Sequence, residues 1–294
     1  MKILITGGSG FFGSALARRL ADAGHAVALL LRPGSSLRRL EHTAARCTVG
    51  RCSSDAELAD FVAATAPEAV VHTACSYGRQ GESLLQLLDA NLRFGAALLQ
   101  AVAALPGHRR VSFLHTGSCL APAVSDYALS KHQFAQWGRA QAVRHPERLQ
   151  FIQLRLQHLY GPGDERTRFV SHVLHSCHAQ QPTLALTAGE QRRDFIYIDD
   201  AVSACQLLLA RAHEMAAHEE VDVGSGTAPT LRCLVQTAHL LTSSRTRLDF
   251  GALPYRPHEA MLCRADTTRL RGLGWAPAYD LPAGQQKTIE LEFP

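Results

Sequence analysis

A short polar stretch holds the residue types needed to transfer a proton to a carbonyl group. Tyr127 and Lys131 lie four positions apart in "SDYALSK", so a helix places both side chains on one face. A free phenol has a pKa of about 10, which is too high for easy proton exchange at neutral pH. A cation one turn away stabilises the phenolate and lowers that pKa. The spacing predicts Tyr127 as a general acid, with Lys131 lowering its pKa and donating to a cofactor ribose.

A hydroxyl group ahead of this helix extends the candidate set. Thr116 lies where the preceding apolar strand runs out, and its hydroxyl can bind the carbonyl oxygen that Tyr127 protonates. Ser118 is the alternative that the spacing leaves open. Such a set suits hydride transfer, in which a nicotinamide delivers hydride to the carbonyl carbon and Tyr127 supplies the proton.

A glycine-rich turn near the start of the chain predicts a dinucleotide site. The segment "ITGGSGFFG" places Gly7, Gly10 and Gly13 after the first apolar strand and at the opening of the first helix. Glycines permit a tight turn there and let backbone N–H groups approach a pyrophosphate, whose charge a helix N-terminus favours.

The end of the second predicted strand favours NADP(H) over NAD(H). NAD-selective folds place an acidic residue here for the ribose 2′-hydroxyl, whereas an arginine accommodates a 2′-phosphate. The segment "LLLRPGSS" offers Arg32 and Ser36, and no acidic residue follows before Glu41.

Apolar strand-like segments alternate with amphipathic helical ones through the first half of the chain. This order predicts a doubly wound α/β fold, with a parallel sheet covered on both faces. The expected strands are 2–7, 25–32, 68–74, 109–118 and 149–163, and the expected helices are 14–24, 54–66, 82–105 and 125–143. We expect a Rossmann domain at 1–163, extended by a strand and helix from 194–220, and a smaller C-terminal α/β substrate domain from 164–193 and 221–294.

Composition excludes several classes of protein. The 294 residues are 46% hydrophobic, and a diffuse net charge of +4 argues against nucleic-acid binding. No apolar run is long enough to predict a membrane span, and with the first strand at Lys2 we expect no leader to be cleaved. Eight cysteines without a C-x-x-C pair predict a reduced, cytoplasmic protein. We expect no metal site, because no carboxylate supports the histidines of "SHVLHSCH" (His172, His175 and His178).

Five motifs together resemble the extended short-chain dehydrogenase/reductase family, also called the NAD-dependent epimerase/dehydratase family. They are "TGGSGFFG", "YALSK", "LYGPGD", "RRDFIYIDD" and "VGSG", and the resemblance covers essentially the whole chain. It implies a Rossmann domain, a small nucleotide-sugar domain and a homodimer formed through the helices near 83–104 and 126–143. The family's Ser/Thr–Tyr–Lys set falls on Thr116, Tyr127 and Lys131.

The same resemblance assigns the other site residues. Arg193 and Arg256 stand at two motifs where the family grips the substrate diphosphate, and Ser118 joins them as a substrate-binding candidate. His158 replaces an asparagine that contacts substrate, and Arg51 replaces an aspartate that contacts adenine. The expected cofactor-binding residues are Gly7, Gly10, Phe11, Phe12, Gly13, Arg32, Ser36, Thr73, Ala74, Tyr127, Lys131 and His158.

The reaction that the resemblance implies is a reduction. A dehydratase needs a carboxylate pair where Gly117 and Ser118 follow Thr116, and the short segment from Thr116 to Tyr127 is similar to the nucleotide-sugar 4-ketoreductase branch, which includes CDP-abequose and CDP-paratose synthases. We expect NADPH-dependent reduction of a CDP-, dTDP- or GDP-linked 4-keto-6-deoxyhexose, in deoxysugar synthesis for surface polysaccharide such as lipopolysaccharide O-antigen. The alternatives are an NAD-dependent nucleotide-sugar 4-epimerase and, in another class, a non-catalytic dinucleotide-binding protein.

Overall fold

The computed structural model describes residues 1–107, 110–256 and 259–294, and these residues form two compact units. The first unit comprises Met1–Arg155 and Val202–Val221, and the second comprises Leu156–Ala201 and Asp222–Pro294. Each unit is therefore built from segments that are discontinuous in sequence. The nucleotide-sugar role expected for the second unit stays a prediction.

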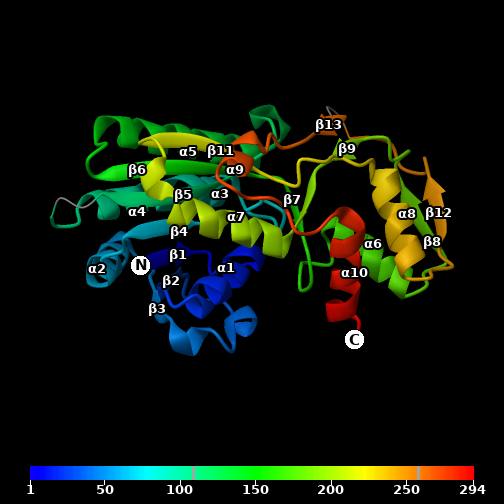
Figure 1. Ribbon diagram of the computed structural model, residues 1–294, viewed down its shortest axis with the longest axis horizontal. Helices are drawn as coiled ribbons and strands as arrows, with labels where there is room; N and C mark the ends of the chain where they lie inside the picture. Colours follow the sequence, from blue (N-terminus) through cyan, green and yellow to red (C-terminus); the bar gives the residue numbers. More distant parts are fainter. Residues whose placement is uncertain (108–109, 257–258) are drawn as a thin grey trace. The chain divides into compact units, whose positions relative to one another are not determined.

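A seven-stranded sheet forms the centre of the first unit (Figure 1). The strands in sheet order are β11 (His218–Val223), β6 (Leu149–Leu156), β5 (Val111–Ser118), β4 (Ala69–His72), β1 (Lys2–Thr6), β2 (Ala26–Leu31) and β3 (Thr48–Arg51). The pairings from β3 through β2, β1 and β4 to β5 are parallel. The predicted doubly wound α/β fold is confirmed.

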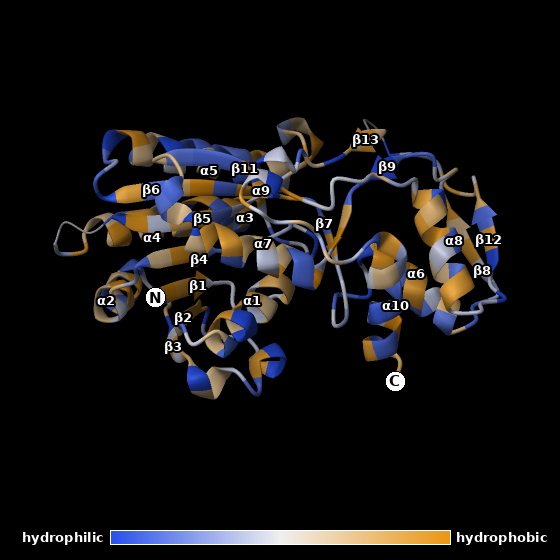
Figure 2. Cartoon of the chain, in the orientation of Figure 1, coloured by the Kyte–Doolittle hydropathy of each residue, from blue (hydrophilic) through white to orange (hydrophobic). Residues whose placement is uncertain are grey.

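Helices cover both faces of this sheet. On one face, α2 (Asp55–Thr65), α4 (Phe94–Ala103) and α5 (Asp126–Arg144) pack onto alternate strand residues such as Leu4 and Val70. Because side chains alternate along a strand, Ile3 and Val71 face the other side, where they are also buried. There α1 (Phe11–Asp22) and α7 (Ile198–Ala210) lie together, and Arg19 Nε donates to Gln206 Oε1 at 3.1 Å. Figure 2 shows the apolar residues of β1 and β4 that this double covering buries.

The long helix predicted over 82–105 contains a local departure from α-helical geometry. The chain forms α3 (Leu84–Leu88), then a π-helical turn at Asp89–Arg93, then α4. A π turn adds one residue per turn and so rotates the side chains that follow it. Asn91 lies within this turn and is only 1% exposed.

Within its described residues, the second unit contains three small parallel strand pairs. The segment 149–163, expected as one strand, divides because β6 ends at Leu156, and β7 (His158–Tyr160) pairs with β10 (Phe195–Tyr197) in a separate sheet. The other pairs are β8 (Thr183–Leu186) with β12 (Arg247–Phe250) and β9 (Arg192–Arg193) with β13 (Leu262–Cys263). The helices of this unit are α6 (Phe169–His178), α8 (Leu231–Leu241), α9 (Thr268–Gly272) and α10 (Leu281–Glu292).

Across the described residues, no helix combines the length and the apolar character that a membrane span requires.

Candidate active site

The predicted proton-transfer residues come from the end of β5 and the first turns of α5. Ser125 caps α5, because its Oγ accepts from Ala128 N at 3.2 Å, and this fixes where the helix starts. Tyr127 follows in the first turn and is half-buried, whereas Lys131, one turn later, is 2% exposed. Ser130 Oγ donates to Tyr127 O at 2.9 Å. The helix therefore places a partly accessible phenol one turn before a buried ammonium.

Both candidate hydroxyl groups lie at the carboxyl end of β5, and each is 6% exposed. Thr116 Oγ1 donates to His72 O at 3.1 Å. Ser118 Oγ accepts from Leu120 N at 3.1 Å, and its own proton has no acceptor among the described residues. Thr116 must turn away from His72 to bind a carbonyl oxygen, whereas Ser118 can donate without breaking a bond.

Two buried histidines lie close to Lys131, and sequence reasoning did not predict this. His72 of β4 and His115 of β5 are register partners, and their rings stack with centroids 5.5 Å apart. Burial, reinforced by the Lys131 charge, lowers the pKa of His72 to about 3 and that of His115 well below its usual value. Burial also lowers the pKa of Lys131. Both imidazoles are thus neutral at pH 7, and the lysine is the titratable cation among these three groups.

The glycine turn has the backbone geometry that close approach to a diphosphate requires. Gly7 has φ +69°, and a Cβ there would lie 2.6 Å from Ala74 N. A Cβ on Gly13 would lie 2.3 Å from Gly7 O, so both positions exclude any side chain. Gly10 begins α1 without a side-chain cap, and the N–H groups of Phe11 and Phe12 point out of the helix start. These residues fit a dinucleotide pyrophosphate.

The segment that follows β4 packs against this turn, since a Cβ on Gly7 would also lie 2.7 Å from Thr73 Oγ1. Thr73 Oγ1 donates to Thr6 O at 2.7 Å, and Ala74 N donates to Thr6 Oγ1 at 3.4 Å. Thr6 Oγ1 also lies 2.7 Å from His72 Nδ1. Thr6 therefore links the end of β1 to the segment after β4 and to the buried histidine.

Arg51 shapes the turn that follows β2. Its guanidinium donates to three backbone carbonyls of that turn, those of Arg32 (3.1 Å), Pro33 (2.6 Å) and Ser35 (3.1 Å). The Arg32 side chain is exposed at the end of β2, and Ser36 Oγ accepts from Arg38 N at 3.3 Å. The turn is thus rigid and basic, with Arg51 supporting it from β3.

The remaining predicted residues lie in the second unit. Arg193 is 7% exposed and donates to Glu259 and, at 2.9 Å, to Arg192 O. Burial, together with the charge of Arg193, lowers the pKa of His158 to about 4. Arg256 is exposed.

A buried carboxylate that sequence reasoning overlooked organises the "VGSG" motif. Asp194 is 0% exposed and accepts from Ser225 N at 2.8 Å, Gly226 N at 2.9 Å and Ala265 N at 3.1 Å. The signal was available in the sequence, because an aspartate inside the apolar segment "RRDFIYI" needs several donors once it is buried.

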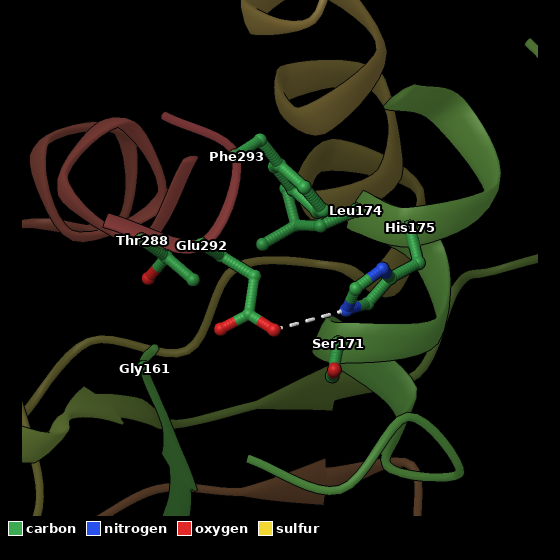
Figure 3. A pocket seen from close by; sticks show the side chains of 7 residues that line it. All are labelled: Gly161, Ser171, Leu174, His175, Thr288, Glu292 and Phe293. Carbon is green, nitrogen blue, oxygen red and sulfur yellow. Dashed lines mark ion pairs between the residues drawn. The ribbon is translucent and has the colours of Figure 1, made fainter. Parts of the chain in front are cut away.

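Two histidines of "SHVLHSCH", His175 and His178, pack against the C-terminal helix beside a small cavity in the second unit (Figure 3). The cavity measures about 10 Å³ and is lined by His175, Glu292 and Phe293 among others, which is far below the size of a nucleotide-sugar site. His175 Nε2 lies 3.4 Å from Glu292 Oε1, and the His178 ring stacks on Phe293 with centroids 4.1 Å apart. Within the described ranges, no group of three or more His, Cys, Asp or Glu residues has the arrangement of a metal site.

Comparison with known proteins adds independent observations. The model of the NAD dependent epimerase/dehydratase family matches residues 3–224. The chain is 29% identical to a CDP-abequose synthase of Salmonella typhimurium, over 98% of this chain and 97% of that protein. It is 25% identical to a UDP-glucose 4-epimerase of Mycolicibacterium smegmatis, over 99% and 98% of the two chains. Among solved structures, UDP-glucose 4-epimerase of Stenotrophomonas maltophila with bound NAD shares the fold with a TM-score of 0.85, at 21% identity over 99% of this chain and 98% of that one.

Proposed function

Since this chain belongs to the NAD-dependent epimerase/dehydratase family, we propose that it reduces the 4-keto group of a nucleoside-diphosphate-4-keto-6-deoxyhexose with NADPH. It is an NAD(P)-dependent enzyme of the short-chain dehydrogenase/reductase type, as the resemblance predicted. The observation that carries the proposal is the pairing of Tyr127 with Lys131, a half-buried phenol one helical turn before a buried ammonium.

Each residue of this set has a defined task in the proposed reaction. NADPH, when bound, supplies the hydride that reduces the keto carbon. Tyr127 donates its proton to the carbonyl oxygen, and the Lys131 ammonium stabilises the phenolate that remains. Thr116 orients the carbonyl oxygen, with Ser118 as the second candidate for this task. His72 and His115, both neutral, leave Lys131 as the cation that acts on the phenol.

Three features support net reduction of a keto sugar. Arg32, Arg38 and the rigid basic turn suit the 2′-phosphate of NADPH, a cofactor that is exchanged at every turnover. Gly117 and Ser118 directly follow Thr116 in place of a carboxylate pair, which disfavours dehydration. The similarity to a CDP-abequose synthase over nearly the whole chain favours a nucleotide sugar as substrate, with Arg193 and Arg256 as proposed ligands of its diphosphate.

A nucleotide-sugar 4-epimerase is the second candidate, supported by the similarity to UDP-glucose 4-epimerases in sequence and in fold. An epimerase oxidises and re-reduces one substrate, so it retains its NAD and consumes no cofactor overall.

The deciding experiment measures NADPH oxidation by the purified protein with CDP- and dTDP-4-keto-6-deoxyglucose in parallel, with NADH as the control cofactor. Turnover of NADPH with one sugar, and loss of that turnover in Tyr127→Phe with NADPH binding retained, would support the ketoreductase. Absence of consumption with both sugars, together with NAD released when the protein is denatured, would identify the epimerase.

We also propose that the protein is a cytoplasmic homodimer in deoxysugar synthesis. Leu85 of α3 is 74% exposed and Trp137 of α5 is 60% exposed, and large apolar side chains of this kind are typical of a buried interface. None of the eight cysteines forms a disulfide in the part of the chain that the structure describes, which suits a reducing compartment.

A further inference from the structure

The phenol of Tyr127 has an aromatic neighbour from a different part of the first unit. The Tyr77 ring lies against the Tyr127 ring with centroids 4.7 Å apart and planes tilted by 36°. The Arg79 guanidinium lies over the Tyr77 ring, 5.7 Å from its centroid. Tyr77 is 40% exposed, so burial in the core does not explain its place beside Tyr127.

Several hydrogen bonds hold the loop that carries Tyr77. Ser76 N donates to Asn91 Oδ1 at 2.7 Å, and Asn91 Nδ2 donates to Ser76 O at 2.9 Å. Gly78 has φ +66°, which turns the chain directly after Tyr77. Glu82 then closes the loop by accepting from Ser76 Oγ and Gln80 N, each at 2.7 Å, and these bonds lower the pKa of its carboxyl group.

The same asparagine also contacts the helix that carries the phenol. Asn91 Nδ2 donates to Ser130 Oγ at 2.9 Å, and Ser130 Oγ donates to Tyr127 O at 2.9 Å. One buried side chain from the π turn therefore fixes the backbone on both sides of the ring contact. Tyr77 directly follows this anchored residue, so its backbone is fixed beside Tyr127.

We propose that Tyr77 is a positioning residue for Tyr127, and that Arg79 holds the Tyr77 ring against it. The inference rests on the proposed role of Tyr127 as proton donor. A phenol in the first turn of a helix rotates about two side-chain bonds, and only one orientation directs its hydroxyl to the substrate. Contact with an aromatic ring on one face restricts that rotation, so Tyr127 is oriented before the substrate arrives.

A spectroscopic test requires no sugar substrate. The chain has six tyrosines, and 3-fluorotyrosine labelling of the full protein with NADPH gives their ¹⁹F signals, which Tyr127→Phe and Tyr77→Phe assign. Tyr77→Ala should shift and broaden the Tyr127 signal, because the neighbouring ring current and restraint are lost. Gln80→Ala, an exposed position in the same loop, is the matched control and should leave that signal in place. An unchanged Tyr127 signal in Tyr77→Ala would overturn the proposal.

A kinetic test separates positioning from folding. With whichever of CDP- or dTDP-4-keto-6-deoxyglucose is turned over, Tyr77→Ala should lower kcat about 10-fold, and Tyr77→Phe should stay within about 2-fold of the parent. The solvent deuterium isotope effect on kcat should rise in Tyr77→Ala, because proton delivery becomes slower, while the Kd for NADPH stays the same.

The two hypotheses fail in different ways. Full turnover by Tyr127→Phe would show that Tyr127 is not the proton donor, and the positioning role of Tyr77 would fail with it. An inactive Tyr127→Phe beside a Tyr77→Ala with parental kcat and isotope effect would overturn the role of Tyr77 alone. The ¹⁹F comparison shows whether the Tyr77 ring contacts Tyr127 even when neither keto sugar is turned over.

Discussion

The Asn91 side chain binds both backbone polar groups of Ser76. It accepts from the Ser76 N–H at 2.7 Å and donates to the Ser76 C=O at 2.9 Å. A side-chain amide offers both an acceptor oxygen and a donor N–H, which this arrangement uses together. Because Asn91 is 1% exposed, no water replaces these bonds when the amide is removed.

Asn91→Leu should therefore destabilise the protein by about 3 kcal/mol, since it removes the partner of two part-buried backbone groups of Ser76 and of Ser130 Oγ. Urea unfolding followed by circular dichroism measures the change. Gln100→Ala, at an exposed position of α4, should stay within about 0.5 kcal/mol of the parent. Equal stability of the two variants would contradict the anchoring role of Asn91.

Substitutions distinguish the roles of the two hydroxyl groups at the end of β5. Thr116→Val keeps the side-chain shape and removes the donor, and it should lower kcat about 100-fold if Thr116 orients the carbonyl oxygen. Ser118→Ala should then cost less than about 10-fold. Steady-state NADPH oxidation measures both variants, and the opposite order would transfer the role to Ser118, whose proton the described structure leaves available.

Arg32 should determine the preference for NADPH over NADH. Arg32→Ala removes a charged donor from the turn after β2. The dissociation constant for NADH divided by that for NADPH should therefore fall about 10-fold or more. Cofactor fluorescence titrations give both constants. Arg46→Ala, which breaks the exposed pair of Arg46 with Asp22, is a control in the same unit and should leave the ratio as it was. A parent protein that binds NADH more tightly than NADPH would contradict the cofactor assignment.

Acid should destabilise the protein partly through His72. Its pKa is about 3 in the folded state and 6.5 when unfolded, so the unfolded chain takes up a proton that the folded chain refuses. The contribution of neutral His72 to the free energy of unfolding is at its full value above pH 6.5. It is lost as the pH falls toward 3, by at most about 1.4 kcal/mol per pH unit.

In His72→Gln, the loss of stability between pH 7 and pH 4 should shrink by about 3 kcal/mol. Urea unfolding at several pH values measures it, with the exposed His213→Gln as the matched control. Parallel pH curves for His72→Gln and the parent would show that His72 does not stay neutral in the fold.

The proposed dimer depends on exposed apolar residues. The double change Leu85→Asp and Trp137→Asp should convert a dimer to a monomer without loss of secondary structure, because charges cannot be buried in the interface. Light scattering after gel filtration gives the mass. Leu240→Asp, at a position 77% exposed in α8, should leave the mass at the parental value. A parent protein that already runs as a monomer would refute the dimer.

The sheet and the glycine turn were predictable because periodic apolar segments and glycine spacing carry strong local signals. Strands 2–7 and 25–32 were expected within one residue of β1 and β2. The π turn at Asp89–Arg93 was not, because its apolar pattern also fits a continuous helix. The turn accompanies tertiary bonds of Asn91 to Ser76 and Ser130, which the apolar pattern does not encode.

In the candidate site, too, local features were predictable from the sequence and tertiary contacts were not. The spacing of Tyr127 and Lys131 follows from helical periodicity, so one sequence is enough to pair them. The stacking of His72 on His115 and the contact of Tyr77 with Tyr127 join segments that are remote in sequence. No spacing rule connects such segments, so these two contacts could be identified only from the three-dimensional structure.

Burial of Lys131 has a practical consequence for amine chemistry. The chain has three lysines, of which Lys131 is 2% exposed, while Lys2 is exposed and the Lys287 side chain is 43% exposed. Reagents that attach proteins to beads or dyes through amino groups will therefore react at Lys2, Lys287 and the N-terminus. Immobilisation by this route leaves the candidate catalytic amine unmodified, and it attaches the protein near its two chain ends.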